Sequence, residues 1–273
     1  MLIPELSIII PNFNGLYLLK PCLQSIYNQT FRAFEVILVD NGSGDGTAEW
    51  VGCHCPDVKI VRFTVNKGFS AAVNEGIRRS RGRYLFLLNN DTEMESSCLE
   101  LLVQTADGNG TYASFAPKMI RYSKRNVLDG LGDGVLRGGV GYRLGNQEPD
   151  GVLWEHPMRV FGPCAGAALY RRSFFENAGM FDEDFFAYLE DVDINFRAVR
   201  LGLLCLSVPG ARVYHMGSQT SGSRLNSFTV SQTTHNMIRV VVHNYPLSIL
   251  LRQWPVIVLH HFGWFALMLW SRH

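Results

Sequence analysis

The 273-residue sequence lacks a marked excess of charge, because 25 Lys and Arg residues stand against 24 Asp and Glu residues. A near-neutral chain offers no long-range field for a nucleic acid or another polyanion, so any phosphate recognition has to be local. None of the six cysteines forms a C-x-x-C pair, which argues against a zinc site or a disulfide framework. We expect reduced, mostly buried thiols, and we interpret Cys53 and Cys55 beside His54 as loop or strand residues rather than as a metal site.

Two phosphate-binding fingerprints are also missing. The glycines of DNGSGDGT (40–47) do not match G-x-G-x-x-G, because Thr47 stands where the last glycine is required. No G-x-x-x-x-G-K-[ST] sequence occurs anywhere in the chain. The N-terminus has neither a basic leader nor a long apolar segment with a cleavage site, and we expect the protein to stay in the cytosol.

Apolar runs that alternate with amphipathic segments make up the first third of the chain, a pattern that predicts an α/β fold with a parallel sheet. The expected strands are 6–10, 34–39, 58–63 and 84–88, and the expected helices are one within 16–29, one that starts at 47, and 70–80. Pro21 has to lie in the first turn of its helix or kink it. Residues 107–150 are rich in glycine and predict loops or short hairpins. Beyond them we expect a strand at 161–172, a helix at 189–201, and short strands at 204–208 and 211–214.

Polar residues follow the expected strands, at the sheet edge where α/β proteins bind ligands. Asp40 ends VILV and can accept hydrogen bonds from a base or ribose, or else cap a tight turn. Asp91 ends YLFLLNN, where a carboxylate suits a divalent metal such as Mg²⁺ or Mn²⁺, or caps the strand. His215 follows ARVY and can be a further ligand of the same cation or a structural residue. Lys67 and Arg172 can neutralise phosphate or lie solvated on the surface.

Glu190 and Asp191 begin a predicted helix. Acids at that position gain from the helix dipole, which is a structural reason for them. If Asp191 faces a bound substrate, its carboxylate can also take a proton from an attacking hydroxyl.

Seven motifs in order carry a resemblance to family 2 glycosyltransferases of the GT-A fold, in particular the bacterial rhamnosyltransferase-like group that builds surface polysaccharides. They span roughly residues 6–221 and are SIIIPNFN, VILVDNGSGDGT, NKGFSAAVNEGI, RYLFLLNNDTEM, GAALYRRSFFENAGMFDEDFF, YLEDVDINFRAVRLG and VYHMGS. The resemblance implies a Rossmann-like, mostly parallel central sheet with flanking helices, followed by an apolar helical tail.

The resemblance also implies roles for individual residues. Asp191 matches the catalytic base and Glu190 would orient the acceptor or that base. Asp91 matches the metal-binding Asp of a D-x-D-like signature whose first acid is replaced here by Asn89, and His215 matches a further ligand of Mg²⁺ or Mn²⁺. The nucleotide would be bound by Pro11, Phe13, Asn14, Asp40, Lys67, Gly68 and Asn90.

The implied reaction is an inverting transfer from a nucleotide diphosphate sugar, dTDP-rhamnose or a UDP-sugar, to a glycan or lipid-linked acceptor. We expect a nucleotide-binding half (1–92), an acceptor-binding half (93–240) and a tail (241–273). The apolar run 247–270 is too interrupted for a membrane span of about 20 apolar residues. We expect the tail to lie in the interface of the cytoplasmic membrane, or else to pack on the domain or on a second subunit.

Two alternatives belong to other classes. One is a non-catalytic scaffold of the same fold that binds a sugar nucleotide, and the joint presence of Asp40, Asp91, Asp191 and His215 argues against it. The other is a sugar nucleotidyltransferase, which would need a basic, glycine-rich loop near the N-terminus that PNFNGLYLL does not supply.

Overall fold

The computed structural model describes residues 4–217 and 226–270, with the side chains of its last helix up to Ala266. Its centre is a ten-stranded sheet in which eight strands follow one another in the order β10-β12-β6-β11-β4-β1-β2-β3, while β5 pairs with β12 and β7 with β6. A separate hairpin joins β8 and β9. The strands are β1 Leu6–Asn12, β2 Phe34–Asn41, β3 Val58–Phe63, β4 Tyr84–Leu88, β5 Thr92–Met94, β6 Tyr112–Arg121, β7 Leu128–Gly130, β8 Asp133–Val135, β9 Gly141–Arg143, β10 Arg159–Val160, β11 Ala167–Arg171 and β12 Leu204–His215.

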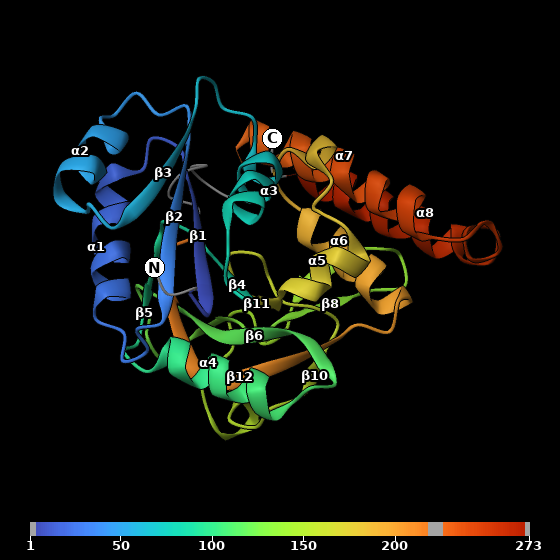
Figure 1. Ribbon diagram of the computed structural model, residues 1–273. Coiled ribbons are helices and arrows are strands. Elements are labelled where there is room, and N and C mark those ends of the chain that lie inside the picture. Colours follow the sequence, from blue (N-terminus) through green and yellow to red (C-terminus); the bar gives the residue numbers. More distant parts are fainter. Residues whose placement is uncertain (1–3, 218–225, 271–273) are drawn as a thin grey trace.

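Helices cover both faces of this sheet (Figure 1). They are α1 Leu16–Tyr27, α2 Thr47–His54, α3 Phe69–Arg79, α4 Cys98–Gly108, α5 Arg172–Ala178, α6 Glu190–Arg200, α7 Ser227–Asn244 and α8 Leu247–Trp270. Successive side chains of a strand point to opposite faces, so Ile8 of β1 packs in the cluster that holds α1 and α4, and Ile9 packs with α3 and α5. This two-sided burial is why the β1 sequence reads as one continuous apolar run.

The first four strands are parallel, and β1 lies between β2 and β4. The chain therefore turns from β1 towards β2 and β3, and then crosses to the other side of β1 to enter β4. Ligands of open α/β sheets bind at such a switch point, beyond the carboxyl ends of the strands. The mostly parallel sheet with flanking helices that we predicted is confirmed.

Pro21 lies beyond the first turn of α1, and the helix continues past it to Tyr27, so the kink stays a prediction. Three local expectations need correction. The glycine-rich region 107–150 contains the long central strand β6 as well as short hairpins. The two short strands expected at 204–214 are one strand, β12, with an irregularity between Val208 and Arg212. The strand expected at 161–172 is reduced to β11, from Ala167 to Arg171.

The last two helices extend from the body as an antiparallel pair (Figure 1), and Trp264 Nε1 of α8 donates to Thr234 Oγ1 of α7 at 3.0 Å. The predicted division at residue 240 falls inside α7, and as a division into domains it stays a prediction. Among the described residues, no helix is both long enough and apolar enough to span a membrane.

Candidate active site

Buried amides join the carboxyl ends of β1 and β4. Asn90 Nδ2 donates to Asn12 Oδ1 at 2.6 Å, across the switch point of the sheet. Asn12 Nδ2 lies 3.3 Å from Ser43 Oγ and 3.2 Å from Thr47 Oγ1, which belong to the loop after β2 and the start of α2. One side chain of β1 thus ties together the two neighbouring strand ends.

The loop after β1 is held against the glycine-rich loop after β2. Asn14 has a left-handed backbone, with φ of 48°. Its backbone N–H donates to Ser43 Oγ at 3.0 Å, and its Oδ1 accepts from the Gly44 N–H at 2.8 Å. Pro11 and Phe13 are half-buried beside it. These three predicted nucleotide ligands therefore lie together at one edge of the sheet.

Asp40 is fully buried at the end of β2. Its Oδ1 accepts from the Ser43 N–H at 3.1 Å, and Arg62 Nε lies 3.5 Å from its Oδ2. Among the described residues, Oδ2 accepts no hydrogen bond. Because a buried carboxylate oxygen without a donor is costly, this atom is a ready acceptor for a ligand N–H.

Lys67 and Gly68 stand at the entrance to α3. The Lys67 backbone N–H donates to Asn41 Oδ1 at 2.8 Å, and its exposed ammonium lies 4.7 Å from the centroid of the Phe63 ring. Gly68 has φ of +87°, and a Cβ there would lie 2.6 Å from the carbonyl oxygen of Phe186. The structure thus requires glycine at position 68 for packing, whatever its backbone binds.

Asp91 and His215 face each other on adjacent strand ends. β12 pairs with β5 so that His215 lies opposite Thr92, and the Met216 N–H donates to the Asp91 carbonyl at 2.9 Å. His215 Nε2 lies 3.4 Å from Asp91 Oδ1, and His215 Nδ1 lies 2.8 Å from Asp129 Oδ2. Burial alone would lower the pKa of His215, but the hydrogen bonds and charges of Asp129 and Asp91 raise it to about 9. Two buried carboxylates around one imidazole make a place that favours a positive charge.

The donor set fits Mg²⁺ or Mn²⁺ in its chemistry, since it offers a carboxylate oxygen and an imidazole nitrogen. Ligand atoms about 2.1 Å from one cation and at right angles to each other lie about 3 Å apart. The 3.4 Å between Nε2 of His215 and Oδ1 of Asp91 is close to that spacing. As ligands of a cation, the two residues stay predictions.

Asp191 begins α6 as predicted, and backbone N–H groups orient its carboxylate. Oδ1 accepts from its neighbour Val192 at 2.8 Å, and Oδ2 accepts from Ala165 at 3.2 Å. Ala165 belongs to the loop before β11, whose next residue, Gly166, accepts from the Asn89 N–H at 2.9 Å. The base candidate is therefore linked through a short loop to the strand end that carries Asp91.

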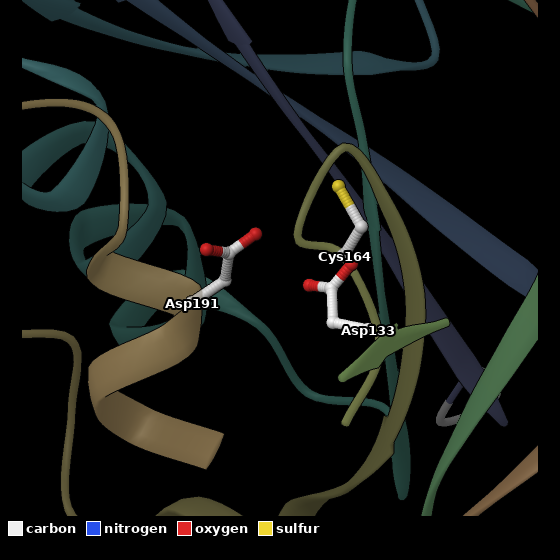
Figure 2. Close-up of side chains that lie close together, drawn as sticks. All are labelled: Asp133, Cys164 and Asp191. Atoms are coloured by element: carbon white, nitrogen blue, oxygen red, sulfur yellow. The ribbon is translucent and has the colours of Figure 1, made fainter. Parts of the chain in front are cut away.

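Figure 2 shows that the side chain of Asp191 points from α6 towards Asp133 and Cys164. The three offer one ligand atom each within 4.8 Å of one another. Burial, and then the charge of Asp191, raise the pKa of Asp133 well above its ordinary value. Burial also keeps Cys164 a thiol by raising its pKa. We interpret this group as the surroundings of the base rather than as a second cation site, because the Arg143 guanidinium is already 2.9 Å from the Cys164 sulfur.

Glu190 is buried directly beside Asp191. Burial, followed by the charge of Asp191, raises the pKa of Glu190 well above its ordinary value. Its Oε2 makes no hydrogen bond to any described residue. These surroundings favour the protonated form of Glu190, next to the predicted base.

The segment before Glu190 has unusual backbone. Phe186 has φ of 57° with ψ of −65°, and Tyr188 and Leu189 have φ of 70° and 66°. Leu189 is in the left-handed conformation, which costs a non-glycine residue about 1–2 kcal/mol. Asn236 of α7 compensates, because its Nδ2 lies 2.9 Å from the carbonyl oxygen of Ala187 and 2.6 Å from that of Tyr188. A helix near the end of the chain thus fixes the turn that aims the predicted base.

Arg172 is half-buried rather than solvated on the surface. Arg172 donates to the Gly82 carbonyl oxygen from Nε at 2.9 Å and to Ser80 Oγ at 3.1 Å, so its guanidinium holds the turn before β4. Five of the six cysteines are buried and all six are free, as expected.

Sequence reasoning missed four residues of this region. Asp129 and Asp133 belong to LDGLGDG, Arg143 lies on β9 and Cys164 precedes β11. The two acids were hidden because their segment reads as glycine-rich loop. Two acids four residues apart among apolar and small residues were the available signal, since a carboxylate buried in such surroundings needs a partner.

Comparison with known proteins decides the family. The model of the family described as "Glycosyl transferase family 2" matches residues 7–179. The chain belongs to this family. The resemblance inferred from the seven motifs is thereby confirmed, and the matched region includes the switch point, Asp40 and Asp91.

Relatives of this family 2 member carry named activities. The N-acetylglucosaminyl-diphospho-decaprenol L-rhamnosyltransferase of Mycobacterium tuberculosis (strain ATCC 25618 / H37Rv) is 29% identical over 227 residues, which are 75% of this chain and 73% of that protein. A PGL/p-HBAD biosynthesis glycosyltransferase of Mycobacterium bovis (strain BCG / Pasteur 1173P2) is 27% identical over 274 residues, 94% of each protein.

A solved structure confirms the GT-A-type fold. "Crystal structure of GalNAc-T7 with UDP, GalNAc and Mn2+" superposes with a TM-score of 0.69 at 20% sequence identity. The match covers 88% of this chain and 48% of that one. At this identity the likeness concerns the fold alone.

Proposed function

We propose that this family 2 glycosyltransferase moves a sugar from a nucleotide diphosphate donor to a hydroxyl of a glycan or lipid-linked acceptor, with inversion at the anomeric carbon. The observation that carries the proposal is the placement of Asp191. Backbone N–H groups fix both of its oxygens, and the loop that supplies one of them pairs with the strand end beside Asp91. A base and a site for positive charge are thus held in one rigid arrangement.

The proposed reaction is one displacement. The acceptor O–H gives its proton to the Asp191 carboxylate while its oxygen bonds to the anomeric carbon. The bond from that carbon to the diphosphate oxygen breaks, and the electron pair leaves with the diphosphate. Asp91 and His215 would hold Mg²⁺ or Mn²⁺, which neutralises charge that develops on the leaving diphosphate.

The nucleotide side supports a donor with a pyrimidine base. Oδ2 of Asp40 accepts no hydrogen bond from the described residues, although Arg62 lies 3.5 Å away, and it is an acceptor suited to a ring N–H. Uracil and thymine both carry such a group, so Asp40 accepts UDP and dTDP equally. We propose dTDP-rhamnose first, because a relative is named as a rhamnosyltransferase, and a UDP-sugar second.

A lipid-linked acceptor is supported by the relatives' names. One names a diphospho-decaprenol acceptor. Another, from Campylobacter jejuni, is a GalNAc(5)-diNAcBac-PP-undecaprenol beta-1,3-glucosyltransferase that is 32% identical over 108 residues, 38% of this chain and 35% of that protein. We therefore propose that the protein acts in cell-envelope polysaccharide synthesis, peripherally at the inner face of the cytoplasmic membrane.

The outer face of α8 supports this location. Leu251, Trp254 and Phe262 are 69%, 61% and 67% exposed, and their spacing places them on one side of the helix. No Asp or Glu occurs between residues 227 and 270, whereas Arg239 and Arg252 do. An acid-free apolar face suits an anionic lipid surface. The other possible occupant of this face is a second copy of the chain.

The first experiment measures nucleoside diphosphate release from a panel of dTDP- and UDP-sugars, with MgCl₂ or MnCl₂ and a polyprenyl-diphosphate-linked acceptor. We expect one donor to be turned over, and Asp191→Asn to lose about 10²- to 10⁴-fold in kcat, the usual effect of a lost general base. The control is Asp184→Asn, an exposed acid of the preceding segment. NMR of the product gives the anomeric configuration.

The alternative of a non-catalytic scaffold predicts nucleotide binding by the wild type without turnover of any donor. Turnover that survives in Asp191→Asn within tenfold of the wild type would instead show that another group is the base.

A further inference from the structure

Asp129 is a buried carboxylate that neither the motifs nor the proposed reaction has used. It lies on β7, beside β6, and is 2% exposed. Its Oδ2 contacts two cationic or polar groups at once, His215 Nδ1 at 2.8 Å and the guanidinium of Arg143. A side chain so placed does not touch solvent and acts on its neighbours.

The hydrogen bond to Asp129 determines which nitrogen of His215 is available. A carboxylate only accepts, so Nδ1 carries the proton that it donates to Asp129. The other nitrogen, Nε2, is the one that faces Asp91. Histidines that bind metals commonly donate their second N–H to a carboxylate in this way, which fixes the ring and makes the ligand more basic.

We propose that Asp129 is a positioning residue of the cation site, and that it holds the His215 ring so that Nε2 and Asp91 bind one divalent cation together. The inference rests on the proposed function, because that function supplies the cation. It adds the residue that selects the binding nitrogen of His215. Asp129 itself does not touch the cation or the sugar.

Arg143 extends this arrangement to the base. Its guanidinium contacts Asp129 through Nη1 and the Cys164 sulfur through Nη2. Cys164 lies against Asp133 and Asp191. The planar guanidinium of an arginine presents several donors and can contact Asp129 and Cys164 together, whereas the ammonium group of a lysine can hold only one of them. Arg143 thus fixes Asp129 from behind and ties the cation side of the site to the base side.

The test measures Mn²⁺ affinity in the wild type, Asp129→Asn and Asp129→Glu by electron paramagnetic resonance of free Mn²⁺, with UDP or dTDP present. We expect Asp129→Asn to weaken Mn²⁺ binding roughly 10- to 100-fold, the usual effect of losing such a partner. Asp129→Glu keeps the charge and should recover part of the affinity. Arg143→Lys should lose less Mn²⁺ affinity than Asp129→Asn.

The chain provides a matched control in the pair Arg197 and Asp193. This pair has side-chain exposures of 28% and 3%, against 29% and 3% for Arg143 and Asp129. Asp193→Asn therefore removes an equally buried ion-paired carboxylate. If Asp129 only stabilised the fold, Asp129→Asn and Asp193→Asn would both lower the melting temperature, and the two variants would bind Mn²⁺ with the same affinity.

Labelling the histidines with ¹⁵N gives a second readout. With MgCl₂ and UDP bound, the His215 signal should show a proton on Nδ1 in the wild type, and Asp129→Asn should change that pattern. Wild-type Mn²⁺ affinity retained in Asp129→Asn would overturn the inference and leave the proposed function standing. If the wild type binds no Mn²⁺ with either nucleotide, both the cation site and the positioning role of Asp129 are overturned. The donor assay then still tests whether the protein transfers a sugar.

Discussion

Buried acids dominate the site at the scale of single residues. Asp191 is half-buried and held by two N–H groups, whereas its neighbour Glu190 is buried with an unpaired oxygen. The two adjacent carboxyl groups therefore lie in different surroundings. We propose that Asp191 accepts the proton of the acceptor, whereas burial raises the pKa of Glu190 and favours its protonated form.

The raised pKa of Glu190 makes stability depend on pH. Because its pKa is higher in the folded than in the unfolded chain, its contribution to stability is complete below the ordinary value of 4.5 and is lost as pH rises towards the folded pKa. One such group changes the free energy of unfolding by about 1.4 kcal/mol per pH unit across that window.

Glu190→Gln removes this dependence. We expect the wild type to lose free energy of unfolding relative to Glu190→Gln as pH is raised from 5 to 8, measured by urea unfolding at each pH. Two curves that run parallel over this range would contradict a neutral Glu190.

At the scale of elements, α3 approaches β1 closely because of one glycine. A Cβ on Gly76 would lie 2.3 Å from Ile9 Cγ2, in the middle of the sheet. Helix α2 offers a contrast, since a Cβ on Gly52 would meet nothing nearer than Ile60 Cδ1 at 4.0 Å. The same substitution should therefore have opposite effects in the two helices.

We expect Gly76→Ala to lower the free energy of unfolding by about 1–3 kcal/mol, because it overpacks the core. Gly52→Ala should raise it by roughly 0.5–1 kcal/mol, because alanine restricts the unfolded chain and favours helix. Urea unfolding measures both. Equal effects from the two substitutions would show that α3 does not pack on β1 at this distance.

The elements show what the sequence could predict. Strands β3 and β4 match their expected ranges. YLFLL of β4 was readily found because it is buried on both faces and ends in turn formers. β6 was missed because it contains Pro117 and Lys118. Lys118 is 1% exposed and forms an ion pair with Asp150 at 2.6 Å. A buried lysine becomes tolerable only when a distant carboxylate pairs with it, and local patterns do not reveal such partners.

The site shows the same limit. Residues at strand ends, such as Asp40 and Asp91, could be selected from the sequence because parallel strands bring their carboxyl ends to one edge. Asp129 gave only the weak signal of an acid among apolar and small residues, and Arg143 gave none, since their partners depend on how β7 pairs with β6 and how β8 pairs with β9.

At the scale of the whole molecule, we propose that the outer face of α8 places the protein at a membrane surface. We expect the protein to sediment with vesicles of phosphatidylcholine and phosphatidylglycerol, and less with phosphatidylcholine alone. The double substitution Trp254→Ser and Phe262→Ser should reduce binding at least tenfold, about 1.4 kcal/mol. The control is Leu153→Ser, because the side chain of Leu153 is 72% exposed elsewhere on the surface.

A protein that stays in the supernatant and has the mass of a dimer would show that the second copy occupies this face. The substitutions on α8 would then yield a monomer.

The contacts of Asn236 limit what a truncated form of the protein can show about membrane binding. Its amide on α7 holds the strained turn that leads to Glu190 and Asp191. A shortened chain that ends before Ser227, made to remove α7 and α8 and improve handling, would also release that turn. Its inactivity would say nothing about lipids. The membrane question has to be asked with point substitutions on the outer face of α8, because α7 also holds the turn that leads to the proposed base.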